Sequence, residues 1–300
     1  MDFLTTLIAS TFRNATPLVY GTLGELYTER AGVLNLGIEG TMYAGAFFGF
    51  AAAYGSGSVL VGLLAAIAIG IAAGALMAFL SVTLGTNQHV AGIGITLLMI
   101  GLSEFFNRII FGGRETLPKI EPLGLLKPFG DGILAQYALT YIAFLVVVPL
   151  AWWLLMRTRF GLDVRAVGEN PEAADTAGIN VFRTRYLALM LGGALMAIGG
   201  AFLTLATLGS FTLDIIAGRG WVCIALVIFG RWKVGRAVLG TLLFAGIFAL
   251  QLRLRILPGW SGVPYELLLA LPYLVTIAAL AISGRHVAYP GAYLKPYHRM

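Results

Sequence analysis

The sequence predicts an all-α protein, a polytopic bundle of transmembrane helices, and three observations indicate this fold class. Apolar residues make up 59% of the 300-residue chain and charged residues only 11%, against about 25% charged in an ordinary soluble domain. The mean hydropathy is +0.87. The apolar residues also fall into runs near the roughly 20 residues that a helix needs to cross a bilayer. A surface this apolar would aggregate in water, whereas in a membrane it faces lipid.

Nine apolar runs account for most of the chain, and we expect a helix in each, within a range of eight to ten spans. They cover residues 4–26, 38–54, 58–82, 90–112, 134–156, 186–209, 217–231, 236–252 and 264–283. The second and seventh runs are short and rich in glycine, so we expect one or two short or broken helices, as in the corresponding halves of some transporters. We expect residues 1–300 to form a single transmembrane domain.

Small residues predict where these helices approach one another. Gly70 and Gly74 have the GxxxG spacing, and Gly193, Ala197 and Gly200 share one stripe of the sixth run. Lipid gives helices no hydrophobic reason to associate, so close backbone packing over small residues takes that role. We therefore expect both stripes to be packing faces.

Lysine and arginine residues indicate the orientation, because cytoplasmic loops are enriched in them. With nine spans, three basic regions fall on one side, namely the loop 157–185, the stretch 231–236 and the tail from 285 onward. We assign that side to the cytoplasm, which places the C-terminus in the cytoplasm and the N-terminus outside. The basic residues of the loop 113–133 and the pair Arg253 and Arg255 count against this orientation.

Composition and motifs exclude several classes of function. The net charge of +6 is explained by cytoplasmic loops and lipid headgroups, so we expect no nucleic-acid partner. Cys223 is the single cysteine and the three histidines are dispersed, so we expect no metal site. No nucleophile–base constellation and no G-x-x-x-x-G-K-[ST] loop is present, so we expect no enzyme activity, catalytic residue or cofactor in this chain.

Polar residues interrupt the apolar pattern between the first and second runs. The stretch 25–40 contains charged side chains and three glycines, which predicts a tight break between two helices. A carboxylate at the start of an apolar segment is costly if it faces lipid. Glu39 and Asn35 either organise a polar break beside a transport path, or Glu39 pairs with Arg30 or lies at a helix N-terminus. We favour the structural interpretation.

The loop 157–185 contains the signals of a short helix. Asn170 is suited to cap it, Pro171 to occupy its first position and Gly178 to end it. A helix exposed between two spans is what a permease driven by a separate motor subunit needs. A helix that merely lies on the membrane surface is the alternative.

Three stretches resemble a known family. Residues 169–179, ENPEAADTAGI, followed by Arg183 and Arg185 and a Gly/Ala-rich helix, resemble the coupling segment of ABC importer permeases for branched-chain amino acids, simple sugars and nucleosides. Residues 29–40, ERAGVLNLGIEG, resemble the E-R-[SA]-G-V-x-N-[IL]-G-[IL]-E-G signature of the simple-sugar and nucleoside branch. The Pro/Gly-rich tail 289–297 resembles the cytoplasmic end of the same group, less specifically.

This resemblance implies a transport subunit of a bacterial inner membrane that works with partners. Two ATP-binding subunits would hydrolyse ATP, a second and longer permease chain would complete the pathway, and an extracytoplasmic lipoprotein would deliver a nucleoside or simple sugar. The segment that would contact the ATPase consists of Gly168, Glu169, Asn170, Pro171, Glu172, Ala173, Ala174, Ala177, Gly178 and Ile179.

Candidates for the substrate pathway are polar or aromatic residues in or beside the apolar runs: Asn14, Thr16, Asn35, Glu39, Asn87, Thr96, Glu104, Asn107, Phe211 and Trp221. Glu104 and Arg108 share a helix face, and we favour a salt pair between them. Phe211 and Trp221 either stack on a base or sugar ring or belong to the interfacial aromatic belt.

Two other kinds of transporter stay open at this point. A carrier driven by an ion gradient would use Glu39 or Glu104 as a proton site, but it has no need of the helix at 169–179. An ABC permease for branched-chain amino acids is the second alternative. A channel would show a filter motif or pore-lining ring, and the sequence has neither.

Overall fold

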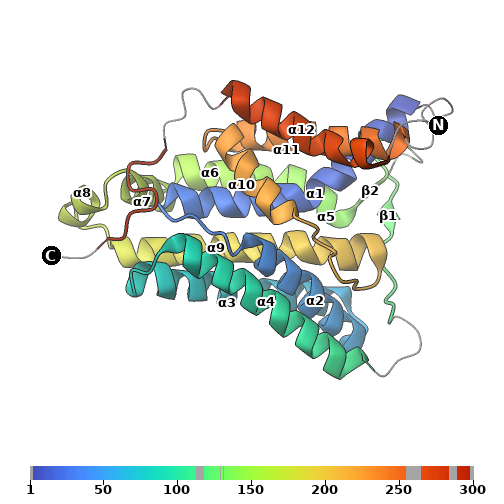
Figure 1. Cartoon of the computed structure of the whole chain (residues 1–300), viewed down its shortest axis with the longest axis horizontal. Helices are drawn as coiled ribbons and strands as arrows, with labels where there is room; N and C mark the ends of the chain where they lie inside the picture. Colours follow the sequence, from blue (N-terminus) through green and yellow to red (C-terminus); the bar gives the residue numbers. More distant parts are fainter. Residues whose placement is uncertain are drawn as a thin grey trace.

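The computed structural model describes residues 3–112, 118–128, 130, 132–254, 265–283 and 289–297. Helices occupy all nine apolar runs in this part of the chain (Figure 1). The N-terminal helices are α1 (Phe3–Arg30), α2 (Ile38–Ser56), α3 (Val59–Ala78), which continues as the π-helical η1 (Phe79–Thr83), and α4 (Gln88–Phe111).

After α4 the chain forms a hairpin of β1 (Leu125–Leu126) and β2 (Gln136–Tyr137). One continuous helix follows, made of α5 (Ala138–Ile142), η2 (Ala143–Val147) and α6 (Val148–Arg157). The remaining elements are α7 (Arg159–Glu169), α8 (Pro171–Thr176), α9 (Val181–Phe202) with η3 (Leu203–Leu208), α10 (Arg219–Phe229), α11 (Val234–Leu254) and α12 (Tyr265–Ser283).

Five of these helices are long and apolar enough to cross a membrane: Val59–Thr83, Gln88–Phe111, Ala138–Arg157, Val181–Leu208 and Val234–Leu254. The chain is thus a helical, multi-pass protein, whereas nine crossings stays a prediction. Helix α1 is less apolar, with Arg13 and Asn14 in its first half and Glu25, Glu29 and Arg30 near its end, and α10 has only 11 residues, so length and composition alone do not select them.

Helix α9 lies at the centre of the bundle. Two thirds (67%) of its most apolar stretch is buried within the protein, against 28% for α3. It packs against α1, α2 and α3, and the contacts use the predicted small residues. A methyl group added at Gly70 would overlap the carbonyl oxygen of Gly193, and one at Gly200 would overlap that of Met42. The exposed faces of α3 and α4 carry large apolar side chains instead, as lipid contact requires.

Two local elements differ from the expectation. The loop 157–185 contains a further amphipathic helix, α7, whose buried residues Gly161, Val164 and Val167 recur every three positions. Thr158 caps it by accepting a hydrogen bond from the backbone N–H of Gly161 at 3.2 Å. The β1–β2 ladder is a second difference, because an all-α fold was expected. The Gln136 side chain supports it by donating to the carbonyl oxygen of Ala9 at 3.1 Å.

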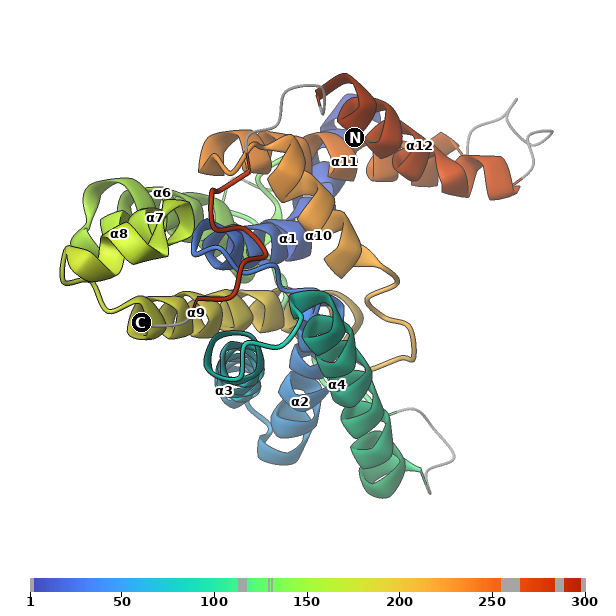
Figure 2. The ribbon, with the colours of Figure 1, turned by 60° about the vertical axis from the view of Figure 1, so that its left-hand side comes forward.

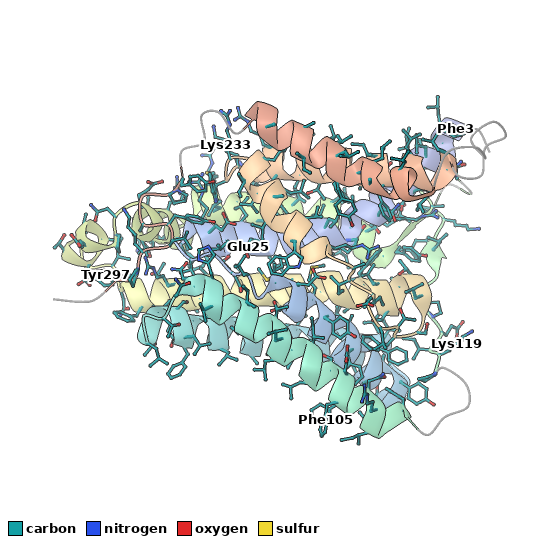
Figure 3. All side chains as sticks on the ribbon, viewed as in Figure 1. Phe3, Glu25, Phe105, Lys119, Lys233 and Tyr297 are labelled. Atoms are coloured by element: carbon teal, nitrogen blue, oxygen red, sulfur yellow. The ribbon has the colours of Figure 1, made fainter. Side chains whose placement is uncertain are left out.

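The two ends of the bundle are distinct. Figure 3 places Lys233 and Tyr297 at one end and Phe3 and Lys119 at the other. Helices α7 and α8 lie at the first end (Figures 1 and 2). The basic loop, the turn after α10 and the described part of the tail, residues 289–297, therefore share one end of the molecule, as the charge pattern predicts.

Candidate functional site: a predicted coupling helix and a large cavity

Helix α8 is a short helix fixed at both ends. Oδ1 of Asn170 accepts a hydrogen bond from the backbone N–H of Ala173 at 3.0 Å, and Pro171 occupies the first position. At the other end Gly178 has φ +86°, and the N–H of Ile179 donates to the carbonyl of Ala174 at 3.0 Å. Six residues cannot hold a helix alone, so these caps define its shape. The predicted cap, first position and stop are confirmed.

The predicted coupling residues divide into an outer and an inner set. The exposed or half-buried ones are Glu169, Asn170, Pro171, Glu172, Ala173, Ala177, Gly178 and Ile179. Ala174 is buried in a cluster with Val167 and Val181, which anchors α8 to α7 and α9. Gly168 is also buried: a methyl group there would overlap the carbonyl oxygen of Arg30. Gly168 therefore joins α7 to the end of α1 rather than facing outward.

The break after α1 is held by buried polar contacts beside the predicted coupling residues. Oε2 of Glu29 accepts a hydrogen bond from the indole Nε1–H of Trp232 at 2.6 Å. Nε of Arg30 donates to the carbonyl of Trp232 at 3.0 Å. Nε of Arg185, at the start of α9, donates to the carbonyl of Ala31 at 3.1 Å. The break thus ties α1 to α9 and to the turn between α10 and α11.

Glu39 joins α2 and α10 at their N-termini. Its Oε1 accepts from the backbone N–H of Gly218 at 2.8 Å, and its Oε2 accepts from that of Gly220 at 2.7 Å. These free N–H groups carry the positive end of the dipole of α10, so a carboxylate is favoured there. The expectation that Glu39 lies at a helix N-terminus is confirmed: Glu39 is in the first turn of its own helix, α2, and its carboxylate also accepts from the free N–H groups at the start of α10. Arg30 bonds Trp232 instead.

Three other candidates for the substrate pathway make hydrogen bonds within the protein. Asn35 is buried, and its Oδ1 accepts from the backbone N–H of Gly37 at 3.0 Å. Oγ1 of Thr96 donates to the carbonyl of Leu36 at 2.9 Å, which attaches α4 to the break. Oγ1 of Thr16 donates to the hydroxyl of Thr140 at 2.9 Å, between α1 and α5.

Apart from Asn14, the remaining candidates lie at the N-cap of α4, on α4, on α10 and in the loop between η3 and α10. Asn87 caps α4 by accepting from the backbone N–H of His89 at 2.9 Å. Glu104 accepts from the hydroxyl of Tyr43 at 3.5 Å. Asn107 is half-buried and Trp221 is 42% exposed. Phe211 is buried, with its ring centroid 5.2 Å from that of Phe47.

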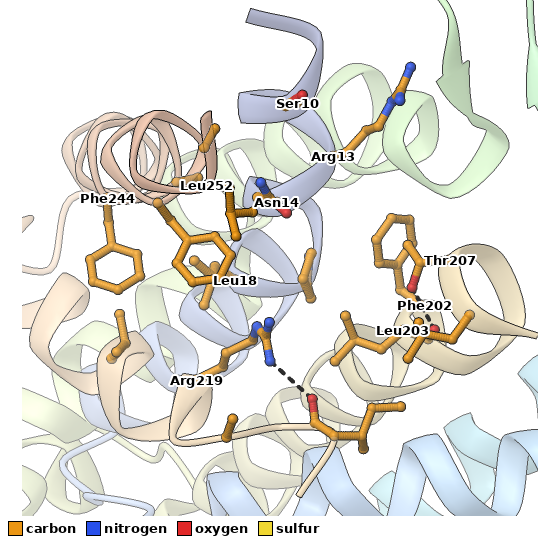
Figure 4. Close-up of a pocket in the computed structure, with 18 of the residues that line it drawn as sticks. Ser10, Arg13, Asn14, Leu18, Phe202, Leu203, Thr207, Arg219, Phe244 and Leu252 are labelled. Carbon is orange, nitrogen blue, oxygen red and sulfur yellow. Dashed lines mark hydrogen bonds between the residues drawn. The ribbon is translucent and has the colours of Figure 1, made fainter. Parts of the chain in front are cut away.

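Asn14 lies on the wall of a large cavity. This cavity of about 840 Å³ lies between α1, the end of α9, α10, α11 and α12. In Figure 4 the guanidinium of Arg219 points toward the side that carries Asn14, whereas Arg13 points away. Arg13 donates from Nη2 to the carbonyl of Ala135 at 2.7 Å. The rest of the wall is mainly apolar and aromatic, including Phe202, Phe244, Phe248 and Tyr273.

Arg219 also lines this cavity, although it is not among the candidates predicted from the sequence. Its Nη1 donates to the carbonyls of Ile215 and Ile216 at 3.0 and 2.9 Å, and its guanidinium lies 5.8 Å from the ring centroid of Phe248. The described lining residues include no carboxylate. The cavity therefore offers hydrogen-bond donors and aromatic faces. Arg219 could have been predicted from the sequence, because a cationic side chain inside an apolar run indicates a functional position.

Comparison with known proteins agrees with these features. The family profile described as "Branched-chain amino acid transport system / permease component" matches residues 7–280. The chain is 38% identical to the "Putative glucose ABC transporter permease protein TsgC13" of Haloferax volcanii, with 100% of this chain and 99% of that protein covered.

Two nucleoside permeases are also similar. The nucleoside ABC transporter permease protein NupC of Lactococcus lactis is 33% identical, with coverage of 96% and 95%. The guanosine ABC transporter permease protein NupQ of Bacillus subtilis is 32% identical, with coverage of 93% and 92%. No solved structure matches the chain. From the family match over most of its length, the chain belongs to the branched-chain amino acid transport system permease family.

Proposed function

We propose that the chain is the permease subunit of an ABC importer and forms half of the pathway for a nucleoside or a simple sugar. Helix α8 is the observation that carries this proposal: a doubly capped helix, exposed at one end of a bundle whose sequence has no phosphate-binding loop. Such a helix gives an ATPase subunit a rigid body to push. ATP hydrolysis then belongs to two partner subunits, and this chain is not an enzyme.

The residues that line the cavity favour some substrate classes over others. Aromatic walls suit the flat face of a base or a sugar ring, and Asn14 and Arg219 suit its acceptor atoms. Relatives named for guanosine, nucleosides and glucose support both classes. A branched-chain amino acid ranks last, because its ammonium group would require a carboxylate that the described lining lacks. An ion-gradient carrier would use Glu39 as a proton site, but two backbone N–H groups already stabilise that carboxylate.

The partners and the orientation complete the proposal. A second, longer permease chain forms the other half of the pathway, and an extracytoplasmic lipoprotein delivers the substrate. The coupling end, with α8 and Tyr297, faces the cytoplasm of a bacterial cell, and Phe3 lies at the outer end of the molecule (Figure 3). With nine spans this orientation satisfies the positive-inside rule at the loop 157–185, the stretch 231–236 and the tail.

Replacing Pro171–Thr176 by a Gly/Ser sequence of equal length tests the proposal. The variant should insert in the membrane and pair with the second permease, because α8 contributes only Ala174 to the buried core. It should lose substrate-stimulated ATP hydrolysis in proteoliposomes that contain the ATPase and binding protein. Hydrolysis and uptake at the wild-type ratio would exclude α8 as the coupling helix.

A further inference from the structure

The described tail folds back along the coupling end instead of leaving the protein. We call residues 289–297 the C-terminal strap (dark red, Figures 1 and 2). The backbone N–H of Ala292 donates to the carbonyl of Gly168 at 2.9 Å, and that of Gly291 donates to Oε2 of Glu169 at 3.2 Å. The middle of the strap is thereby bound to the C-terminal end of α7.

The end of the strap contacts the coupling helix, α8. The hydroxyl of Tyr297 donates to Oδ2 of Asp175, on α8, at 2.9 Å. Tyr297 is only 8% exposed and packs in the same cluster as Ala174 and Val167. Its ring centroid lies 6.0 Å from that of Phe182, in the first turn of α9. The strap therefore contacts α8 through the Tyr297 side chain, which is itself fixed by packing.

The beginning of the strap packs on the turn between α10 and α11. The ring centroids of Tyr289 and Tyr293 lie 5.0 and 6.2 Å from that of Trp232. Trp232 is 1% exposed and has φ +53°, a strained conformation for a tryptophan. Burial, and then the nearby carboxyl of Glu29, raise the pKa of Tyr293 well above its ordinary value, so this residue stays neutral in the contact.

These contacts form a continuous path from the coupling face to the cavity. It runs from Asp175 on α8 through Tyr297 and the strap to Trp232, which lies in the turn after α10. Helix α10 carries Arg219 into the cavity wall at its other end. A rigid helix passes a displacement at one end to the other, so movement of the strap would reach the substrate side.

We propose that the C-terminal strap is a positioning element, which orients α8 for the ATPase and carries its displacement to Trp232 and α10. This inference rests on the proposed function. Tyr297 and Trp232 are positioning residues, because they act through α8 and α10. A positioning role differs from a purely structural one in its effect: loss of a strap contact lowers the amount of substrate moved per ATP, while the complex still assembles.

The test is Tyr297→Phe in the complete complex, reconstituted in proteoliposomes with both ATPase subunits, the second permease and the binding protein. Uptake and ATP hydrolysis are measured in the same vesicles. The variant keeps the ring in its cluster and loses the bond to Asp175. We expect a roughly two- to tenfold fall in substrate moved per ATP, the range that corresponds to one lost hydrogen bond. Asp175→Asn keeps an acceptor oxygen and should retain most of the wild-type ratio.

Tyr186→Phe is the matched control, because it loses a hydroxyl contact with Thr83 that lies outside the strap. A Tyr297→Phe ratio equal to that of Tyr186→Phe overturns the positioning role. Failure of the Tyr297→Phe complex to assemble also overturns it, since the contact would then be structural. If the wild-type complex itself shows no substrate-stimulated ATP hydrolysis, the proposed function fails instead, and the two failures are distinguishable.

Discussion

The Glu39 carboxylate, at the start of α2, lies 2.7 Å from the backbone nitrogen of Gly220, at the start of α10. A second bond of 2.8 Å reaches Gly218. The two helices belong to opposite halves of the chain, and one side chain satisfies free N–H groups of the second helix at the point where both begin. We therefore expect this bridge to set the relative position of α2 and α10.

Glu39→Gln tests the bridge. Glutamine keeps one acceptor oxygen and turns an NH₂ group toward an N–H donor, so we expect a loss of about 2 kcal/mol, typical of a hydrogen bond to a charged group. Thermal unfolding of the purified protein in detergent measures this loss. Glu104→Gln is the control, because Glu104 accepts only a 3.5 Å bond from Tyr43. Equal melting temperatures for the two variants would contradict a role of the bridge in stability.

Gly200→Ala should disrupt the packing of α9 on α2. The added methyl group would overlap the carbonyl oxygen of Met42, and overpacking of this kind costs about 1–3 kcal/mol. Gly94→Ala is the matched control in α4, where the same methyl group meets open space. That variant should be neutral or gain up to about 1 kcal/mol, since alanine favours a helix interior. The melting temperatures of the two variants, measured by thermal unfolding, test this expectation. A Gly200→Ala protein as stable as Gly94→Ala would contradict the close contact.

Asn170→Ala should loosen the coupling helix specifically. Loss of an N-cap costs about 1 kcal/mol, and a helix of six residues has few backbone hydrogen bonds of its own to offset that loss. Hydrogen exchange of the amides in residues 172–176 should become faster, and substrate-stimulated ATP hydrolysis should fall. Asn180→Ala removes the equivalent cap of the 22-residue α9 and should leave exchange in α8 unchanged. Equal exchange of α8 in both variants would contradict a local role of Asn170.

Asn14→Ala should weaken substrate uptake through the cavity. We expect the KM for uptake to rise roughly tenfold, as for the loss of one good hydrogen bond, with ATPase assembly unchanged. Asn107→Ala provides the comparison, because Asn107 lies on α4, outside the cavity lining. The concentration dependence of uptake in proteoliposomes measures the effect. An unchanged KM in Asn14→Ala would place the substrate elsewhere.

Features that depend on neighbouring residues could be predicted from the sequence. The apolar runs gave the helices, the Asn170–Pro171 pair and Gly178 gave α8, and the small residues at 70 and 193 gave a packing face. Each depends on spacing along a few turns, which a single sequence displays.

Features that depend on distant partners could not be predicted. The sequence marks Glu39 as a carboxylate in need of a partner, but nothing in it identifies Gly218 and Gly220, about 180 residues away. The strap is a similar case, because its contacts with Trp232 and Asp175 require the folded bundle. Polarity in an apolar run likewise does not separate Asn14, which lines the cavity, from Thr16, which bonds Thr140.

The central position of α9 has a consequence for biosynthesis. Helices α1, α2 and α3 each contact α9 through notches at Gly24, Gly45 and Gly70, and a side chain at any of them would overlap the α9 backbone. The ribosome delivers these three helices to the membrane long before α9, and parts of a chain that pair across long sequence separations assemble late. The notches must therefore stay covered by lipid or by an insertion factor until α9 arrives. Substitutions in α9 should then reduce the yield of inserted protein more strongly than substitutions of equal size in α4.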